Sequence, residues 1–335
     1  MANLPKIRRS PDGGPQGAPA AVTEPAAPDV RRLEAHGLTW LNIESPSERE
    51  TAWLAEHYEF HHLDLEDVLS RRRQRPKIDT YPDYLFIVLH FPRFDKRTGR
   101  LQPAELNIFV ADGLVITLPN EPLKALSGLW SRVKRSEEAR DQVMSKGSAY
   151  LLYEIVDTMY DYCFPILDKI GFKLDRIEDA LFEEDAAEAM VRDISNAKQE
   201  IINYRKIVKP QRPTLGLLER SCQRYTPDDL ELYFDDIVDK SERVWDLLEN
   251  YKEVAEALEA TNESVITHRM NDIIRVLTIM SAIVLPLSLI ASIYGMNVDL
   301  LPFARSGAFS LVFPLVLMVG FAGALIWWFR HKRWL

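Results

Sequence analysis

Cysteine is scarce in this chain of 335 residues, which contains only Cys163 and Cys222. Two isolated thiols provide neither a disulfide framework nor a zinc motif, and we expect both in a reducing compartment. The sequence also lacks a phosphate-binding loop and any nucleophile paired with a base at a catalytic spacing, so it does not favour an enzyme. An apolar stretch near the N-terminus is missing as well, and we therefore expect no secretory signal.

Charge is absent from two long segments near the C-terminus. The chain carries 41 basic and 50 acidic residues, a net charge of −9, but only seven charged residues follow position 270, so residues 1–270 carry −12. The runs 276–298 and 306–329 contain no charge over 23 and 24 residues. As helices each would be roughly 35 Å long, enough for a hydrocarbon core of about 30 Å. Buried helices of a soluble protein are the alternative, but two adjacent runs favour two transmembrane helices.

Basic residues flank both apolar runs on the same side. Arg269 and Arg275 precede the first run, and 330–333 (Arg-His-Lys-Arg) follow the second, whereas the connecting loop has one Asp and one Arg. The positive-inside rule therefore predicts a multi-pass protein of the cytoplasmic membrane, with both termini in the cytoplasm.

The region after the Pro- and Gly-rich first 30 residues has the pattern of a small α/β domain. Strands are expected at 38–43, 84–91, 106–110 and 114–118, the last two joined by a hairpin at Asp112-Gly113. Ser45, Pro46 and Glu48 match a capping box, which predicts a helix N-terminus with Ser45 as the N-cap. Runs of strands with helices beside them favour a mixed sheet.

Helical patterns dominate from about residue 121 onward. An antiparallel helix pair is expected over 148–209, with an acidic turn that is either simply solvated or attracts cations. No glycine occurs between Asp228 and Tyr294, and the only proline there is Pro286, which predicts one helix of roughly 100 Å running into the membrane. The expected organisation is a disordered leader 1–30, a mixed-sheet domain 31–120, a helical region 121–227, a stalk 228–275, a first span 276–297, an external loop 298–308, a second span 309–329 and a basic tail 330–335.

The first apolar run carries a stripe of small, polar and apolar side chains at spacings of three and four. We call the following residues the stripe: Asn271, Ile274, Leu277, Thr278, Ser281, Leu285, Ser288 and Ser292. Small residues of this kind serve either close helix packing or the lining of a pore. Two helices cannot enclose a channel, so a water-facing stripe would require a homo-oligomer.

Gly295, Met296 and Asn297 follow this run directly. Gly295 can be read as a helix C-cap in the left-handed conformation. In a homo-oligomer, Asn297 could instead form a ring of amide oxygens at a pore mouth. Such a ring would suit magnesium, which loses its waters reluctantly.

At these residues the sequence resembles the CorA family of magnesium and cobalt channels. The resemblance rests on 271–279 (NDIIRVLTI), on Tyr-Gly-Met-Asn at 294–297, on a second span ending in 330–335 (RHKRWL), and on 65–69 and 75–78. It implies a homopentameric, funnel-shaped α+β membrane protein in which the stalk helix becomes the pore-lining span. Asn297 would contact the hydrated ion, Asn271, Ser288 and Ser292 would form polar rings, and Ile274, Leu277 and Leu285 would form apolar constrictions.

The family resemblance also implies regulation by cytosolic magnesium bound between subunits. Asp67 matches one such position and Glu66 lies beside it, although a plain surface charge is the other interpretation of Asp67. The facing stalk position is Ala260, with Glu259 and Glu263 nearby. The external loop offers only Asp299 where magnesium members often carry Glu, and a thinner acidic ring would weaken cation capture or shift the ion preference.

The expected function is passive influx of magnesium and cobalt, driven by the membrane potential and gated by cytosolic magnesium. No cofactor is expected, Mg²⁺ being the transported and regulatory ion, and the expected partners are further copies of the chain, the bilayer and divalent cations, with no nucleic acid. A zinc transporter of the ZntB type, with proton coupling left open, is the near alternative. A membrane-tethered oligomeric sensor or scaffold is the alternative from another class.

Overall fold

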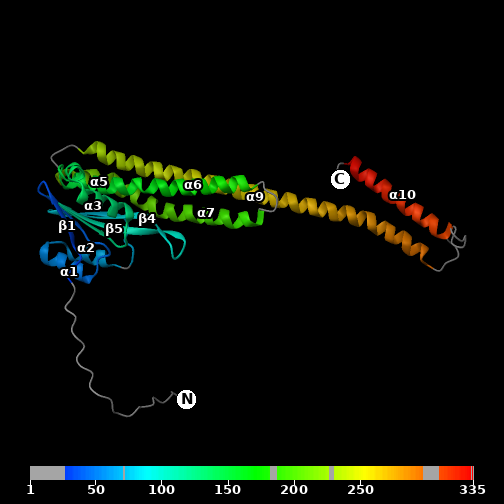
Figure 1. The fold of residues 1–335 in the computed structure, drawn as a ribbon, viewed down its shortest axis with the longest axis horizontal. Coiled ribbons are helices and arrows are strands. Elements are labelled where there is room, and N and C mark those ends of the chain that lie inside the picture. Colours follow the sequence, from blue (N-terminus) through cyan, green and yellow to red (C-terminus); the bar gives the residue numbers. More distant parts are fainter. Residues whose placement is uncertain are drawn as a thin grey trace, which may run out of the picture.

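The structure is a computed structural model that describes residues 27–70, 72–181, 187–225, 230–296, 309–332 and 334. A body of sheet and helices lies at one end, and one long helix leaves it toward a second helix at the far end (Figure 1). The strands are β1 (Arg31–Ala35), β2 (Leu38–Asn42), β3 (Lys77–Thr80), β4 (Tyr84–Asp95), β5 (Arg100–Ala111) and β6 (Leu114–Pro119). The helices are α1 (Glu48–His57), α2 (His62–Leu69), α3 (Lys124–Arg135), α4 (Glu137–Met144), α5 (Ser148–Asp161), α6 (Cys163–Ala180), α7 (Ala187–Val208), η1 (Lys209–Gln211), α8 (Arg212–Cys222), η2 (Gln223–Tyr225), α9 (Glu231–Tyr294) and α10 (Phe309–His331).

Within the described residues, six strands form one mixed sheet in the order β1-β2-β6-β5-β4-β3. Only β2 and β6 pair in parallel, and every other neighbouring pair is antiparallel. Gly113, with φ +65°, turns the chain between β5 and β6, as the Asp112-Gly113 pattern predicts. The mixed sheet and the expected hairpin are thereby confirmed.

Both faces of the sheet are covered, which explains why its central strands are almost continuously apolar. One face packs against α1 and α2 through a core that includes Leu54, Phe86 and Phe109. The other face packs against the helical bundle through a larger core that includes Trp40 and Leu89. The body is therefore a sheet between a thin layer of two helices and a thick bundle (Figure 1).

Helix α1 begins two residues later than the sequence predicts. Ser47, not Ser45, is the N-cap, and it forms a reciprocal capping box with Glu50. Ser45 has φ +54°, and its N–H still donates to the carbonyl of Pro119, 2.9 Å away. The chain has not yet left the sheet at Ser45, so the helix can only start after it.

The antiparallel pair expected over 148–209 is built from three helices. One arm consists of α5 and α6, which are separated only at Tyr162, and the other arm is α7. Helices α6 and α7 pack on each other and on α9. The turn itself, at 182–186, lies outside the described residues.

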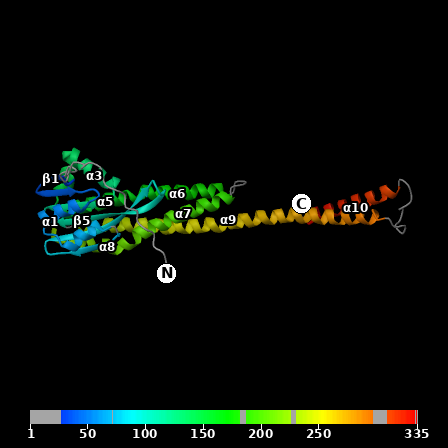
Figure 2. The ribbon, with the colours of Figure 1, turned by 90° about the horizontal axis from the view of Figure 1, so that it is seen from below.

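Helix α9 confirms the long continuous helix. It has 64 residues, includes Pro286 and carries the chain from the body to the far end (Figure 2). In the body its buried residues recur at spacings of three and four, with Phe234, Ile237, Ser241, Val244 and Leu248 facing the bundle. This is the pattern of an amphipathic packing helix. After Asn262 no residue of α9 is buried until Ile279, so the helix runs uncovered between the body and α10.

Candidate ion pathway

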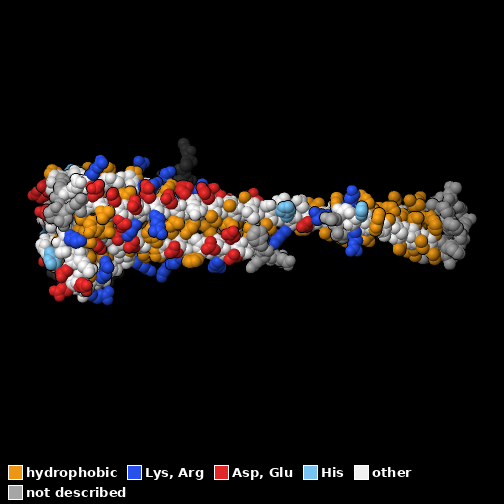
Figure 3. All heavy atoms as spheres, turned by 90° about the horizontal axis from the view of Figure 1, so that it is seen from above, with side chains coloured by type: hydrophobic (Ala, Val, Ile, Leu, Met, Phe, Trp, Pro, Cys, Tyr) orange, Lys and Arg blue, Asp and Glu red, His pale blue; other side chains and the backbone are white. Residues whose placement is uncertain are grey.

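Two helices of the described chain are long and apolar enough to cross a membrane, namely the last part of α9 and the main part of α10. Only 6% of either apolar window is buried within the single chain. Hydrophobic side chains dominate this end of the molecule, whereas acidic and basic side chains are spread among hydrophobic ones over the body (Figure 3). Exposed apolar surface on this scale requires lipid or other protein around it.

Helix α10 covers one face of α9. Ile279 is 6% exposed, and Ala282, Ile283, Pro286 and Ile290 are half-buried along the same face. Spacings of three, one, three and four keep these residues on one side of a helix. The rings of Tyr294 and Phe313 lie 6.1 Å apart at the far end of this contact.

Most of the stripe lies on the opposite face of α9, with Asn271 and Thr278 at its edge. Each helical residue turns the chain by about 100°, so positions two apart point in nearly opposite directions. Leu277 and Ser281 each stand two residues from the covered Ile279, and Ser288 and Ser292 each stand two residues from Ile290. All eight stripe residues are exposed in the single chain: Asn271, Ile274, Leu277, Thr278, Ser281, Leu285, Ser288 and Ser292.

The described stripe residues are exposed and do not pack against other elements of the chain. Within the stripe, the Thr278 hydroxyl donates to the carbonyl of Ile274, 2.7 Å away, so that polar group is satisfied within the helix. Leu285, Leu277 and Ile274 are 69%, 63% and 53% exposed. The structure thus brings the stripe residues together on one face, and that face is available for water or for further helices.

The helix ends at Gly295 in a way that differs from the prediction. Gly295 has φ −79° and ψ −10°, which is the right-handed helical region, so the expected left-handed cap is wrong. Its N–H donates to the carbonyl of Ala291, 2.9 Å away, and a Cβ at Gly295 would lie 3.1 Å from that carbonyl oxygen. Glycine therefore relieves a close contact here instead of a strained dihedral angle. Met296 is exposed, and Asn297 and Asp299 lie outside the described residues.

The carboxylates expected to bind regulatory magnesium are already paired with lysines or stand alone. The Nζ of Lys77 lies 2.8 Å from the Oδ2 of Asp67, and it also donates to Asp79. Burial opposes the charge of Lys77, but the hydrogen bonds to both carboxylates outweigh it and raise the pKa of Lys77 above 10.5. Glu66, beside Asp67 on α2, is exposed.

On the stalk, Glu259 accepts a hydrogen bond from Lys198 of α7 at 2.6 Å, and Glu263 is exposed. The described residues contain no group of three or more His, Cys, Asp or Glu side chains that could hold a metal ion. A metal site between these carboxylates would therefore need a second copy of the chain. Sequence reasoning missed Lys77 as the partner of Asp67, because nothing in the order of residues 67–79 reveals that β3 passes beside α2.

Known proteins are similar to this chain in sequence and, in one solved structure, in fold. The chain is 28% identical over 300 residues to the cobalt/magnesium transport protein CorA of Thermotoga maritima, covering 89% of this chain and 83% of that protein. It is 20% identical to the zinc transport protein ZntB of Pectobacterium carotovorum, covering 88% of each. The structure of the CorA magnesium transporter from Methanocaldococcus jannaschii superposes with a TM-score of 0.75 at 21% identity, covering 94% of this chain and 96% of that one.

A model of one protein family matches nearly the whole body and both apolar helices. The match extends over residues 35–332 and carries the description CorA-like Mg²⁺ transporter protein. The mixed α/β body, the continuous α9 and the two candidate spans are the fold that the resemblance implied. The chain therefore belongs to the CorA-like family, whose members are divalent cation transporters of membranes and not enzymes.

Proposed function

We propose that this chain is a channel for passive magnesium and cobalt influx in which several copies surround one water-filled axis. The observation that carries the proposal is the position of the stripe on the face of α9 opposite α10. If α10 faces lipid on the outside, the stripe faces the centre of a ring of α9 helices. The Thermotoga maritima relative, named for cobalt and magnesium transport, supports this choice of ions.

An oligomer is also supported by the uncovered part of α9. None of residues 263–278 is buried, although several of them are hydrophobic. Met270, Ile273 and Leu277 are 57%, 69% and 63% exposed. Helices in proteins gain most of their stability from packing of an apolar face, and copies packed side by side would bury these side chains. The pentameric number comes from the family resemblance alone.

Hydrated magnesium fits a pore lined by hydroxyl and amide groups. Ser281, Ser288 and Ser292 would offer weak oxygen contacts that an ion can leave again, and Asn297 would meet it at the outer mouth with Asp299 nearby. The interior-negative membrane potential favours inward movement of a cation by about 2.3 kcal/mol per charge per 100 mV. For a divalent ion this energy is twice as large. No ATP is needed to drive influx.

Cytosolic magnesium would close the channel by binding between subunits. The exposed Glu66 and Glu263, together with Asp67 and Glu259, are the proposed ligands. The acidic body carries like charges that repel when the ion leaves. Because Lys77 and Lys198 already neutralise two of these carboxylates, the ion must displace a lysine at each.

The zinc transporter similar to this chain supports zinc as the second candidate cargo. Uptake of magnesium, cobalt and zinc into proteoliposomes, with and without a proton gradient, separates these ions and tests proton coupling. Wild-type protein that transports none of them would instead support a sensor or scaffold.

The pore assignment is tested by adding bulk on each face. Ser288→Trp should reduce magnesium uptake at least tenfold, because it narrows the proposed axis. Val319→Trp, on the exposed side of α10 where Val319 is 71% exposed, is the matched control and should keep uptake within about twofold of wild type. Asn297→Ala should also lower uptake. Equal uptake by Ser288→Trp and wild type would place the pathway elsewhere.

A further inference from the structure

A basic hollow lies where the sheet meets the end of α7. It has a volume of about 580 Å³, and the residues that matter here are Arg73 and Arg75 from the segment before β3, His90 from β4, and Lys206 from α7. Cavities that bind small molecules have volumes of about 300–1,000 Å³. The hollow is therefore large enough for a small ligand.

The segment that carries the two arginines is held in place at both ends. The N–H of Gln74 donates to the buried carboxylate of Glu105, 3.0 Å away, and the carbonyl of Pro76 accepts from the hydroxyl of Thr214 on α8 at 3.3 Å. The backbone of Arg75 is thus held between these two bonds, and Arg73 directly precedes the first, while both side chains are exposed. A backbone fixed in this way loses less entropy on binding a ligand than a free loop.

The positive charge of the hollow is only partly offset by its surroundings, through Glu105, which bonds to the lining residues Gln74 and His90. In the part of the chain that the structure describes, no carboxylate lines it, and no ion-pair partner is found for Arg73, Arg75 or Lys206. The nearby Glu105 is 2% exposed and is already bound by Gln74, Asn107 and His90. Burial opposes ionisation of Glu105, but these hydrogen bonds lower its pKa, so it remains a charged anchor.

A second hollow of about 480 Å³ adjoins the first and shares Lys206 and Pro210 with it. Lys209, Lys252 and Arg205 line this second hollow; Lys252 pairs with Glu256 at 3.4 Å and Arg205 with Glu249, whereas the Nζ of Lys209 lies 5.8 Å from the ring of Trp245 on α9. The basic surface therefore extends from the sheet across α7 to the stalk helix. On a body with a net charge of −12, such a cluster creates a local positive field that attracts anions.

We propose that the basic hollow binds a phosphorylated anion with two or more phosphate groups, such as a nucleoside di- or triphosphate. Arginine forms paired hydrogen bonds with phosphate oxygens, and lysine adds a point charge. A lipid headgroup is excluded by distance. Trp245 lies 31 residues before Val276, where the apolar run begins, and this corresponds to roughly 46 Å of helix.

The charge pattern also predicts which form of the anion binds. Magnesium bound to a triphosphate cancels part of its negative charge, and the hollow offers no carboxylate to hold the metal. The metal-free anion therefore binds more tightly than its magnesium complex. Its occupancy rises when free magnesium falls, and the bound anion joins the sheet to helices that pack on α9.

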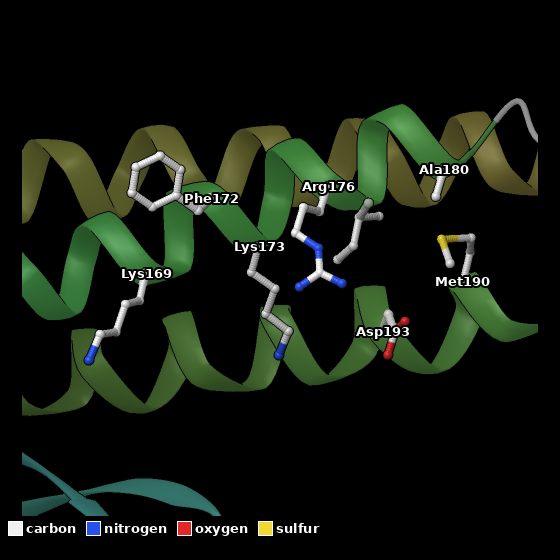
Figure 4. Close-up of a pocket in the computed structure, with 8 residues that line it drawn as sticks. Lys169, Phe172, Lys173, Arg176, Ala180, Met190 and Asp193 are labelled. Carbon is white, nitrogen blue, oxygen red and sulfur yellow. The ribbon is translucent and has the colours of Figure 1, made fainter.

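A third hollow supplies the control. It lies between α6 and α7, has a volume of about 460 Å³, and contains Lys169 and Arg176, but Asp193 stands on its other wall (Figure 4). Lys173 in the same hollow is paired with Glu200 at 3.0 Å. Three cations are present here too, but two carboxylates, Asp193 and Glu200, offset most of their charge, so this hollow should bind phosphates much more weakly.

The test is calorimetric titration of the detergent-purified full chain with tripolyphosphate, ATP and inorganic phosphate, in EDTA and in excess magnesium. We expect tripolyphosphate and ATP to bind, excess magnesium to weaken both at least threefold, and inorganic phosphate to bind much more weakly. Arg73→Gln combined with Lys206→Gln should weaken tripolyphosphate binding at least tenfold. Lys169→Gln combined with Arg176→Gln removes the same charge and should change it less than twofold.

Three results would overturn the proposal. The first is no binding of any polyphosphate to wild-type protein at 0.15 M salt. The second is equal weakening in both double variants, which would indicate attraction by net charge only. The third is a changed oligomer mass of Arg73→Gln/Lys206→Gln together with no polyphosphate binding by wild type. The hollow would then be a contact surface for a neighbouring copy of the chain. Melting curves of each variant in EDTA show whether it is folded.

Discussion

Replacing Lys77 with glutamine should turn a lysine-bridged pair of carboxylates into a site that magnesium can occupy. The ammonium group of Lys77 bonds to both Asp67 and Asp79. Side-chain exposure is 32% for Lys77, 23% for Asp67 and 36% for Asp79, so water screens these charges only in part. Glutamine keeps most of the side-chain length but leaves two negative groups facing each other.

The size of the effect follows from these contacts. Each partly screened ion pair contributes up to about 1 kcal/mol, so Lys77→Gln should cost about 1–2 kcal/mol in the absence of divalent ions. A pair of carboxylates that binds magnesium with a Kd of about 1 mM would regain about 1.4 kcal/mol at about 10 mM magnesium. The variant should therefore be clearly less stable than wild type in EDTA and nearly equal to it in magnesium.

Thermal unfolding of the full chain in EDTA and in 10-fold excess of magnesium over the expected Kd measures this difference. Lys173→Gln is the matched control, because Lys173 is also 32% exposed and pairs with Glu200 at 3.0 Å. Magnesium should stabilise Lys173→Gln no more than it stabilises wild type, so the stability lost in this variant should not be regained. If Lys77→Gln and Lys173→Gln respond equally to magnesium, Asp67 and Asp79 do not form a latent metal site. Adding Asp67→Asn to Lys77→Gln should abolish the extra response.

Three further outcomes are expected. Burial opposes ionisation of Glu50, but hydrogen bonds from Ser47 and Arg49 lower its pKa from 4.5 to about 2. Its stabilising effect is thus complete above pH 4.5 and lost as the pH falls toward 2, and Glu50→Gln should cost about 1–2 kcal/mol at pH 7 but little at pH 2 in denaturant titrations. Cys163 and Cys222 are each 1% exposed, and burial raises the pKa of Cys163 to about 12, so a maleimide should label both only after denaturation. Gly295→Ala should shift the melting temperature by no more than about 2 °C, because the helical φ of Gly295 suits alanine while the close contact of its Cβ with the Ala291 carbonyl opposes it. A larger decrease would indicate that residue 295 is left-handed.

Sequence patterns predicted the inner strands of the sheet but not its edges. β2, β4, β5 and β6 lie in the interior and are visible as apolar runs. The two edge strands, β1 and β3, were missed. In β1 only Leu33 is buried, and β3 has no buried residue, so neither carries a hydrophobic signal. Edge strands commonly carry charged side chains, which protect a sheet from unwanted pairing.

Local signals failed where two placements fit the same rule. Ser45 and Ser47 each precede a glutamate by three residues, so the capping-box pattern fits both. The choice depends on the long-range hydrogen bond from Ser45 to Pro119, which the local sequence does not contain. Gly295 illustrates the same limit, because glycine is used both for left-handed turns and for close contacts.

The stripe was predictable because it depends only on helical spacing, and helix α9 is regular enough to preserve that spacing. Spacing alone left helix packing and pore lining as equal alternatives. The position of α10 on the opposite face favours pore lining. The contact between α9 and α10 uses Ile279 and Ile290 and leaves Ser281, Ser288 and Ser292 exposed. The roles of the individual stripe residues remain predictions that the uptake assays test.

Pro286 gives the two ends of the first span different mechanical properties. A proline removes one backbone hydrogen bond and frees the carbonyl of Ala282, and both residues lie on the face half-covered by α10. Bending at this point moves Ser288 and Ser292 relative to Ile274 and Leu277, while the helix below continues without glycine to the body. Displacement of the stalk by a ligand in the body would then first reach the part of the stripe before Pro286, which contains its apolar members Ile274, Leu277 and Leu285. We therefore expect gating to act at Ile274 and Leu277, and ion selection to act beyond Pro286.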